Sequence, residues 1–184
     1  MIKAKNNLKL YDKGLYFLSL GGIGEIGANC YLYCCDGKWI MIDLGLSFAD
    51  EQYPGVDLLV PKVKFIEEIK DNLVGIIISH GHEDHAGAVA YLADKIKCPV
   101  YAFSFAKLLI ENRLKEFGKL ESINLIELDS TKNLLLDKFN LRFIDTTHSI
   151  PQTKAIVIET EYGNLLHTAD WKIDEKPTLG SSFN

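Results

Sequence analysis

The sequence has no long hydrophobic run, which excludes a membrane-spanning helix of ordinary length. Its strongest apolar runs, residues 15–20 and 74–79, are six residues long, far short of the ~20 that a bilayer requires. The first ten residues mix lysine and asparagine with isolated apolar residues, so they lack the continuous apolar core of a signal peptide. We therefore expect a cytoplasmic protein with no membrane partner.

Cysteine is scarce, and its spacing excludes two common roles. The four cysteines include the adjacent pair Cys34 and Cys35 and form no C-x-x-C motif, which suits neither a disulfide framework nor a thiolate zinc site. Positive charge is not in excess either, because 25 acidic side chains outnumber 20 basic ones and the net charge is -5. This balance argues against a protein coated in basic charge for nucleic acid, but it leaves room for a local basic groove.

The pattern of apolar residues predicts a layered α/β fold in a single domain. Short runs rich in β-branched and aromatic residues predict strands, and helical spacing of apolar residues predicts helices in the middle of the chain. Turn residues at Asp36-Gly37 and Tyr162-Gly163-Asn164 predict antiparallel hairpins in the first and last thirds, so the sheet should be mixed. We expect strands at residues 15–20, 30–35, 39–44, 74–79, 100–103, 124–128, 140–146, 155–160 and 165–168, and helices at 63–69, 86–96 and 105–117, the last between a Ser104 cap and Gly118.

Three of the five histidines fall in one stretch of six residues. His80, His82 and His85 surround Glu83 and Asp84, directly after the apolar run and directly before a predicted helix. Imidazole and carboxylate groups are ligands for zinc and related ions, and open sheets hold their sites at the carboxyl ends of strands. His80 and His82 project to the same side of an extended chain and can share one ion, while Asp84 and His85 can hold a second. The competing interpretation is a solvated polar loop.

Two later strand ends can complete such a site. His148 follows the strand predicted at residues 140–146, and Asp170 follows the one at 165–168. His148 would supply a third imidazole, and Asp170 a carboxylate that bridges two ions, which together give a dinuclear core. We expect His167, within the last strand, to have a structural role behind the ligands rather than to bind metal itself.

These blocks resemble a known family. The order His-x-His-x-Asp-His, then His148, then Asp170, each at a strand end, resembles the metallo-β-lactamase fold, an αββα sandwich. The match is closest to the ribonuclease J family, whose blocks are similar to residues 20–27, 54–57, 80–85, 148–151 and 167–170. The resemblance covers nearly the whole chain. It implies that residues 1–184 are the amino-terminal portion of an incomplete metallo-β-lactamase domain, without the family's β-CASP insertion and carboxy-terminal part.

The resemblance also implies a set of metal ligands. It places Asp170 as a bridge between two zinc ions and Asp43 behind the ligands, where it orients them, and it makes Asp84 and Asp170 the catalytic carboxylates. The cofactor would be zinc, two ions per complete site, with Mn²⁺ and Mg²⁺ as alternatives. The implied ligands are His80, His82 and His148 for the first ion and Asp84 and His85 for the second.

The activity implied by the resemblance is hydrolysis of RNA phosphodiester bonds by a zinc-bound hydroxide, in RNA processing and decay. It would proceed 5′-to-3′ as an exonuclease, with endonuclease activity left open, and the full-length family suggests homo-oligomers. The sequence departs from the family at Ala169, where glycine is usual, and at Gln152, where an acidic residue is common. It also has no histidine after His167, whereas the family carries another ligand downstream, so we expect weak or no catalysis from this chain alone.

Two alternatives share the ligand set. One is a small metallo-β-lactamase-fold hydrolase of thioesters or lactones, and the other is a non-catalytic, truncated remnant that binds metal. A third pattern, Gly22-x-Gly24-x-x-Gly27, formally matches a dinucleotide-binding fingerprint. That fingerprint requires a helix next, and a strand is predicted instead. We therefore expect these glycines to shape a loop near the metal site, with Asn29 as a polar contact to substrate.

Overall fold

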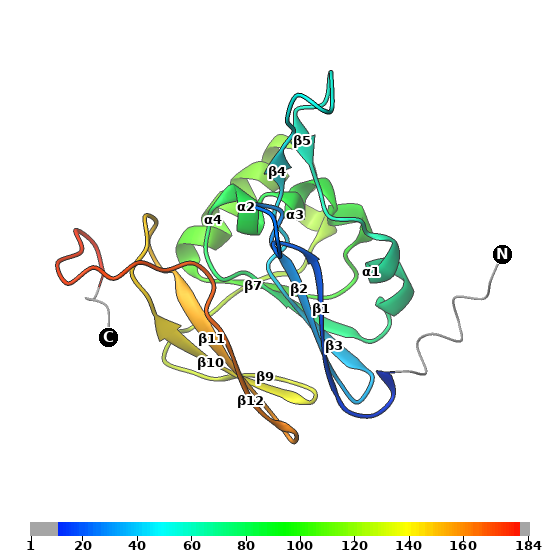
Figure 1. The fold of residues 1–184 in the computed structure, drawn as a ribbon, viewed down its shortest axis with the longest axis vertical. Helices are drawn as coiled ribbons and strands as arrows, with labels where there is room; N and C mark the ends of the chain where they lie inside the picture. The colour runs from blue at the N-terminus through cyan, green and yellow to red at the C-terminus, as the bar shows by residue number, and fades with distance from the viewer. Residues whose placement is uncertain (1–10, 181–184) are drawn as a thin grey trace.

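Two β-sheets stack face to face in the computed structural model, which describes residues 11–180 (Figure 1). The first sheet has six strands in the order β1-β2-β3-β6-β7-β8. Strands β1 to β3 pair antiparallel, and the pairs from β3 to β8 are parallel, so the sheet is mixed as predicted. Its strands are β1 (Leu15–Gly21), β2 (Cys30–Cys35), β3 (Lys38–Ile42), β6 (Leu73–Ile77), β7 (Val100–Ala102) and β8 (Leu125–Glu127).

The second sheet is fully antiparallel, in the order β12-β11-β10-β9. Its strands are β9 (Leu134–Leu136), β10 (Phe139–Asp145), β11 (Lys154–Thr160) and β12 (Gly163–His167). Thr160 pairs with Gly163, so the turn is Glu161-Tyr162, and the prediction that Gly163 and Asn164 belong to the turn is wrong. The sequence analysis also missed β9 and the short hairpin of β4 (Ser47–Phe48) and β5 (Leu58–Leu59), because strands of two or three residues leave no readable alternation.

The helices differ from the sequence prediction in two places. The helix expected at residues 86–96 is broken at Gly87 and Leu92, and the one at 105–117 does not use Ser104 as its cap. Ser104 is instead the first helical residue, and Gln152 Oε1 accepts the backbone N–H of Phe105 at 2.8 Å. The helical segments are α1 (Lys64–Ile69), α2 (Glu83–Ala86), α3 (Ala88–Tyr91), η3 (Ala93–Lys95), α4 (Ser104–Glu116) and η4 (Leu120–Ser122).

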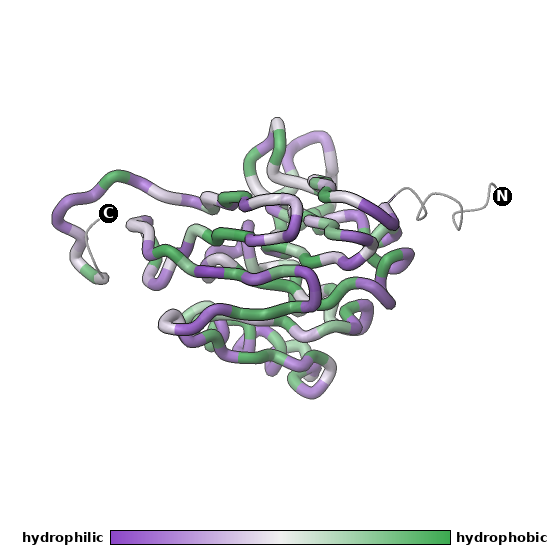
Figure 2. The backbone as a smooth tube through the Cα atoms, turned by 90° about the horizontal axis from the view of Figure 1, so that it is seen from below, coloured by the Kyte–Doolittle hydropathy of each residue, from purple (hydrophilic) through white to green (hydrophobic). Residues whose placement is uncertain are grey.

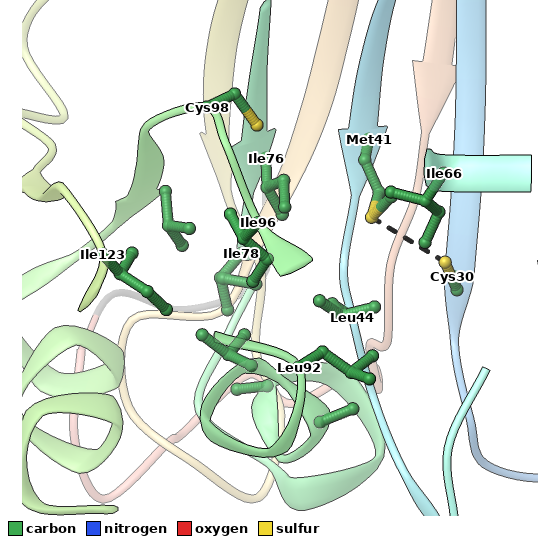
Figure 3. Close-up of a cluster of buried hydrophobic side chains, with 14 of the residues drawn as sticks. Cys30, Met41, Leu44, Ile66, Ile76, Ile78, Leu92, Ile96, Cys98 and Ile123 are labelled. Carbon is green, nitrogen blue, oxygen red and sulfur yellow. Dashed lines mark hydrogen bonds between the residues drawn. The ribbon is translucent and has the colours of Figure 1, made fainter. Parts of the chain in front are cut away.

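The buried side chains form two cores, one on each face of the first sheet. Figure 3 shows the core under the helices, where Met41 and Ile76 from the sheet meet Leu92 and Ile96 from the helical segments. The other core lies between the sheets, where Tyr33, Ile40, Ile42 and Ile77 meet Phe139, Leu141, Ile156 and Ile158. Residues 11–180 thus form a helix–sheet–sheet sandwich, and the outer helical layer of an αββα arrangement is not among them.

Hydrophilic and hydrophobic residues alternate in short stretches along the chain (Figure 2). Within residues 11–180, no helix has the length and hydropathy needed to cross a bilayer. After Asp170 the described chain contains neither helix nor strand and runs away from both sheets (Figures 1 and 2). Asp170 therefore lies at the point where the folded body ends and this extended segment begins.

Candidate metal centre

The predicted ligands meet where strands of both sheets end. The segment from His80 to His85 follows β6 in the first sheet, while His148 follows β10 and Asp170 follows β12 in the second. Their ligand atoms form two groups, each with all atoms within 4.8 Å of one another, and His80 belongs to both. The groups are His80, His82 and His148, and His80, His85 and Asp170.

Three imidazole nitrogens converge in the first group. His82 Nδ1 lies 3.0 Å from His80 Nε2 and 3.1 Å from His148 Nε2. Burial, reinforced by the neighbouring His85, lowers the pKa of His80 to about 3, and burial together with His82 lowers the pKa of His148. Both rings are therefore held neutral, the form in which imidazole binds metal. Three imidazole nitrogens within 4.8 Å of one another, two of them on rings held neutral, suit a divalent metal ion.

Asp43 orients the rings of His80 and His85, directly or through Ser79. Its fully buried carboxylate accepts hydrogen bonds from the Ser79 N–H at 2.7 Å and from the Ser79 hydroxyl at 2.8 Å. The Ser79 hydroxyl oxygen can in turn accept from His80 Nδ1 at 2.9 Å, while His85 Nδ1 donates to Asp43 at 2.7 Å. Because Nδ1 is the donor in both histidines, Nε2 is the atom that each ring turns toward the site, and in the neutral ring it offers the lone pair that metal binding requires.

The charge of Asp43 is itself stabilised by these contacts. Burial raises the pKa of Asp43, but the charge and hydrogen bond of His85 lower it by more than burial raises it. The net pKa of Asp43 is therefore below its usual value. Burial likewise lowers the pKa of His85, and the Asp43 carboxylate outweighs that effect, so the net pKa of His85 is raised. The pair is thus a buried ion pair or its hydrogen-bonded equivalent under the candidate site.

Asp170 spans the two groups of ligand atoms. Its Oδ1 lies 3.4 Å from His85 Nε2, and its Oδ2 lies 3.5 Å from His148 Nε2. Asp84 approaches from the other side, with Oδ2 at 3.6 Å from His85 Nε2. The two carboxylates and His85 could hold a second cation next to the one between the three histidines, because carboxylate and imidazole are both ligands for zinc.

Asn29 and His167 lie beside these ligands. Asn29, expected to contact substrate, lines the same pocket as His85 and Asp170 and places Nδ2 3.2 Å from Asp84 Oδ2 and 3.0 Å from His85 Nε2. His167 lies outside both groups, with Nδ1 2.9 Å from the Tyr33 hydroxyl. No described residue hydrogen-bonds its buried Nε2. His167 thus packs against the site without being brought into either set of ligand atoms.

Sequence reasoning missed several partners of the ligands. Ser79 directly precedes His80 and could have been noticed as its hydrogen-bond partner, and Ser149 directly follows His148 and lies 3.4 Å from His82 Nε2. Tyr31 lies two residues from Asn29, on the same side of an extended chain, and could also have been noticed. Tyr33 gave no comparable signal, because its contact to His167 depends on how the strands pack together. Polar residues adjacent to a ligand can be read from sequence, whereas partners from other strands cannot.

Two pockets flank the ligand atoms. One, of about 220 Å³, is bounded by His85, Asp170 and three aromatic rings of β1 and β2. The other, of about 210 Å³, lies between His148 and the extended segment, with Lys172 and Asp174 in its wall. The ligand atoms therefore have open space on two sides, and Asp170, with 44% of its side chain exposed, lies between them.

The sequence matches a family model described as the metallo-beta-lactamase superfamily over residues 23–179. The chain belongs to this superfamily. Membership implies divalent metal binding, in agreement with the convergent histidines.

Two solved structures share the superfamily fold, both at low sequence identity. A protein of unknown function from Enterococcus faecalis V583 has a TM-score of 0.67 at 18% identity and covers 86% of this chain and 44% of its own. The metallo-beta-lactamase fold protein YhfI from Bacillus subtilis has a TM-score of 0.57 at 17% identity and covers 84% and 61%.

Curated relatives within the superfamily are more similar in sequence. Ribonuclease J of Sinorhizobium meliloti is 41% identical over 174 residues, which cover 92% of this chain and 31% of that protein. Ribonuclease J 2 of Staphylococcus aureus is 33% identical over 168 residues, covering 91% of this chain and 30% of the relative. The chain thus spans about a third of the length of these superfamily relatives. The predicted resemblance is confirmed over nearly all of the chain.

Proposed function

We propose that this chain belongs to a metal-dependent ribonuclease of the ribonuclease J type, which hydrolyses RNA phosphodiester bonds. The observation that carries the proposal is the convergence of three imidazole nitrogens, with Asp170 extending from them to His85. The 41% identity to a protein named ribonuclease J supports RNA as the substrate. The proposed activity is 5′-to-3′ exonucleolytic.

The proposed metal is zinc, in two sites. We assign Asp170 as the bridge between them, because its two oxygens face His148 and His85 separately. When bound, two such ions activate water and share the negative charge that develops on a phosphodiester. The assigned ligands are His80, His82 and His148 for the first ion and Asp84 and His85 for the second.

The protein's own groups prepare this site for an anionic substrate. Asp43 directs the Nε2 atoms of His80 and His85 toward the ions, so no ring must change its tautomer on binding. The pocket beside His148 is lined by Lys172, whose ammonium lies 2.9 Å from Asp174 Oδ2 and would have to exchange this partner to bind a phosphate of the RNA backbone. A substrate strand in this pocket would have its scissile phosphate next to the ligands and the adjoining backbone near Lys172.

Metal content tests the assignment directly. Elemental mass spectrometry of protein purified without chelators should find two zinc ions in the wild type and one in Asp84→Ala. One ion in both would show that only the three-histidine site fills, as expected of a non-catalytic remnant. No ion in the wild type would overturn the proposal. The same measurement distinguishes zinc from manganese or magnesium.

Activity tests the substrate class with matched histidine variants. A single-stranded RNA labelled at its 5′ end should release its label in single nucleotides, at most slowly because the chain spans about a third of its relatives' length, and His82→Ala should abolish this cleavage together with metal at the first site. His167→Ala is the matched control and should keep its metal. Equal metal loss in both variants would contradict the choice of His148 over His167 as a ligand. Thioester or lactone hydrolysis without RNA cleavage would overturn the ribonuclease assignment.

A further inference from the structure

The glycine-rich loop between β1 and β2 closes over two polar side chains next to the ligands. Gly22 has a φ of +81°, and a Cβ built there would lie 2.2 Å from the Tyr31 hydroxyl and 2.4 Å from Asn29 Oδ1. At Gly21 a Cβ would lie 2.1 Å from the carbonyl oxygen of Ala28. Both glycines therefore permit a close approach that any side chain would prevent. Gly21 approaches the backbone of Ala28, and Gly22 approaches the side chains of Asn29 and Tyr31.

A one-way hydrogen-bond chain runs from Tyr31 through Asn29 to Asp84. The carbonyl oxygen and the carboxylate of Asp84 can only accept, and Asn29 Nδ2 donates to them at 3.1 and 3.2 Å. The amide oxygen of Asn29 is thereby turned toward the Tyr31 hydroxyl, which donates to it at 2.7 Å. Only 9% of Asn29 is exposed, so water competes little with these bonds.

The main chain of Asn29 is held by hydrogen bonds on both sides, so the orientation of its side-chain amide is what remains to be fixed. The Asn29 N–H donates to the Asp84 carbonyl at 3.0 Å, and the Asn29 carbonyl accepts from the Gly45 N–H at 2.9 Å. The main chain of residue 29 is thus bonded to both the α2 segment and the chain after β3. The Tyr31 hydroxyl then determines which end of the amide faces Asp84, because its proton favours the amide oxygen.

We propose that Asn29 and Tyr31 are positioning residues for the second metal ion. The Asn29 amide holds Asp84 Oδ2, the oxygen that faces His85 Nε2, and Tyr31 holds the amide. An unrestrained Asp84, with 37% of its side chain exposed, would rotate toward solvent and would have to be ordered on binding. This inference rests on the proposed metal centre and adds to it two residues that are not ligands. Asn29 Nδ2 also lies 3.0 Å from His85 Nε2 and would give up that contact when the ion binds, while it keeps its bonds to Asp84.

The expected effect is selective for the second ion. Removing hydrogen-bond partners behind metal ligands typically lowers metal affinity 10- to 100-fold. Tyr31→Phe and Asn29→Ala should each weaken the second zinc ion by about this factor, while the three-histidine site keeps its affinity. Tyr31→Phe should have the smaller effect, because Asn29 keeps its bonds to Asp84 and loses only the partner that orients its amide.

The test is a zinc titration of the whole chain against a chelator of known affinity, which resolves the two binding steps. Tyr16→Phe is the matched control, because it removes a hydroxyl from β1 that donates to the Lys13 carbonyl, outside the site. The metal-free melting temperature of each variant is measured alongside, and Tyr31→Phe should match Tyr16→Phe. A second step weakened in Tyr31→Phe and Asn29→Ala, but not in Tyr16→Phe, would support the proposal.

Two results would overturn the inference and leave the proposed function intact. In the first, the wild type binds two ions and Tyr31→Phe and Asn29→Ala do so with unchanged affinity. In the second, both steps weaken equally, which would assign Asn29 and Tyr31 a general structural role. A wild type that binds no zinc would instead overturn the metal centre itself, and the inference with it.

Discussion

Two residues next to the candidate ligands adopt left-handed backbone conformations without being glycine. Asp43 has a φ of +63° and Ala169 a φ of +49°. Aspartate tolerates this region because its side chain can bond locally, whereas alanine meets a steric cost of roughly 1–2 kcal/mol. At Asp43 the conformation accompanies a carboxylate with three hydrogen bonds beneath the site. At Ala169 it precedes Asp170 with no comparable compensation from the methyl side chain.

Ala169→Gly should therefore stabilise the protein. Glycine adopts a φ of +49° without the Cβ clash, which should raise the free energy of unfolding by about 1 kcal/mol. The measurement is denaturant unfolding of the metal-free protein. Ala155→Gly in β11 is the matched control and should lower stability, because there glycine brings only added flexibility. Destabilisation by Ala169→Gly would mean that the alanine methyl makes contacts worth more than the strain.

Histidine 167 should make the metal-free protein sensitive to acid. Burial lowers the pKa of His167 below the ordinary 6.5, and the carboxylates of Asp43 and Asp170 oppose this only in part, with His85 adding to it. Below pH 6.5 the unfolded chain then binds a proton that the folded protein does not. Stability contributed by neutral His167 is thus present above pH 6.5 and lost as the pH falls, by at most about 1.4 kcal/mol per pH unit.

The His167→Gln variant isolates this contribution. His85 has a raised pKa and acts in the opposite direction, since its stabilisation is lost as the pH rises, but it is present in both proteins and cancels in their difference. Unfolding with a chelator present should show the stability advantage of the wild type over His167→Gln shrinking from pH 7 to pH 5. A constant difference over that range would show that His167 titrates alike in the folded and unfolded states.

At the level of strands and helices, the elements that carry a local residue pattern of their own were predicted correctly. All nine expected strands are present within one or two residues at most ends, because each carries its own alternation or apolar run. The break of the 86–96 helix at Gly87 was not predicted, although glycine is a poor helix former. Ser104 failed as a cap because of a contact that is distant in sequence, since Gln152 reaches the helix from a loop 47 residues from Phe105.

The candidate site divides in the same way. The segment from His80 to His85 could be read from spacing, and His148 and Asp170 from their places after predicted strands. The bond that restrains Asp84 joins it to Asn29, 55 residues away, and the bond that holds His167 beside the ligands joins it to Tyr33, 134 residues away. Such pairs leave no periodicity in the sequence, because only the packing of the sheets brings them together.

The junction between the end of β3 and helix α2 depends on one glycine. A Cβ on Gly45 would lie 1.6 Å from the carbonyl oxygen of Asp84, a backbone atom that cannot move aside. Gly45→Ala should destabilise the protein by at least ~2 kcal/mol and displace the Asp84 segment, because backbone must shift to admit the methyl group. Denaturant unfolding and zinc content should both report the change.

Gly75→Ala is the matched control for this substitution. There a Cβ would come within 2.9 Å of Leu136 Cδ1 and 3.0 Å of Tyr101 Cε2, both side-chain atoms that can adjust. The control should therefore cost less stability and leave zinc content unchanged. If Gly45→Ala behaves like Gly75→Ala in both measurements, the close approach to Asp84 is not the constraint that fixes this junction.

At the scale of the whole molecule, the candidate ligands join two sheets that otherwise meet mainly through apolar packing, with a few hydrogen bonds such as Tyr33 to His167. His80 and His82 follow β6 of the first sheet, whereas His148 follows β10 of the second. Among the described residues, the core between the sheets has ten buried members against twenty-six in the core under the helices. An ion held by all three histidines would therefore add a cross-link at the less extensive of the two interfaces.

Zinc should consequently stabilise the whole fold, and only when both sheets contribute ligands. At a free zinc concentration 100 times its dissociation constant, binding adds about 2.7 kcal/mol, which for a domain of this size raises the melting temperature by about 5–10 °C. A chelator should reverse the shift. His148→Ala should reduce it, because the first ion then keeps His80 and His82 from one sheet and only Asp170 from the other, while His167→Ala should retain it. An equal shift in His148→Ala and the wild type would show that His148 is not needed to hold the ion.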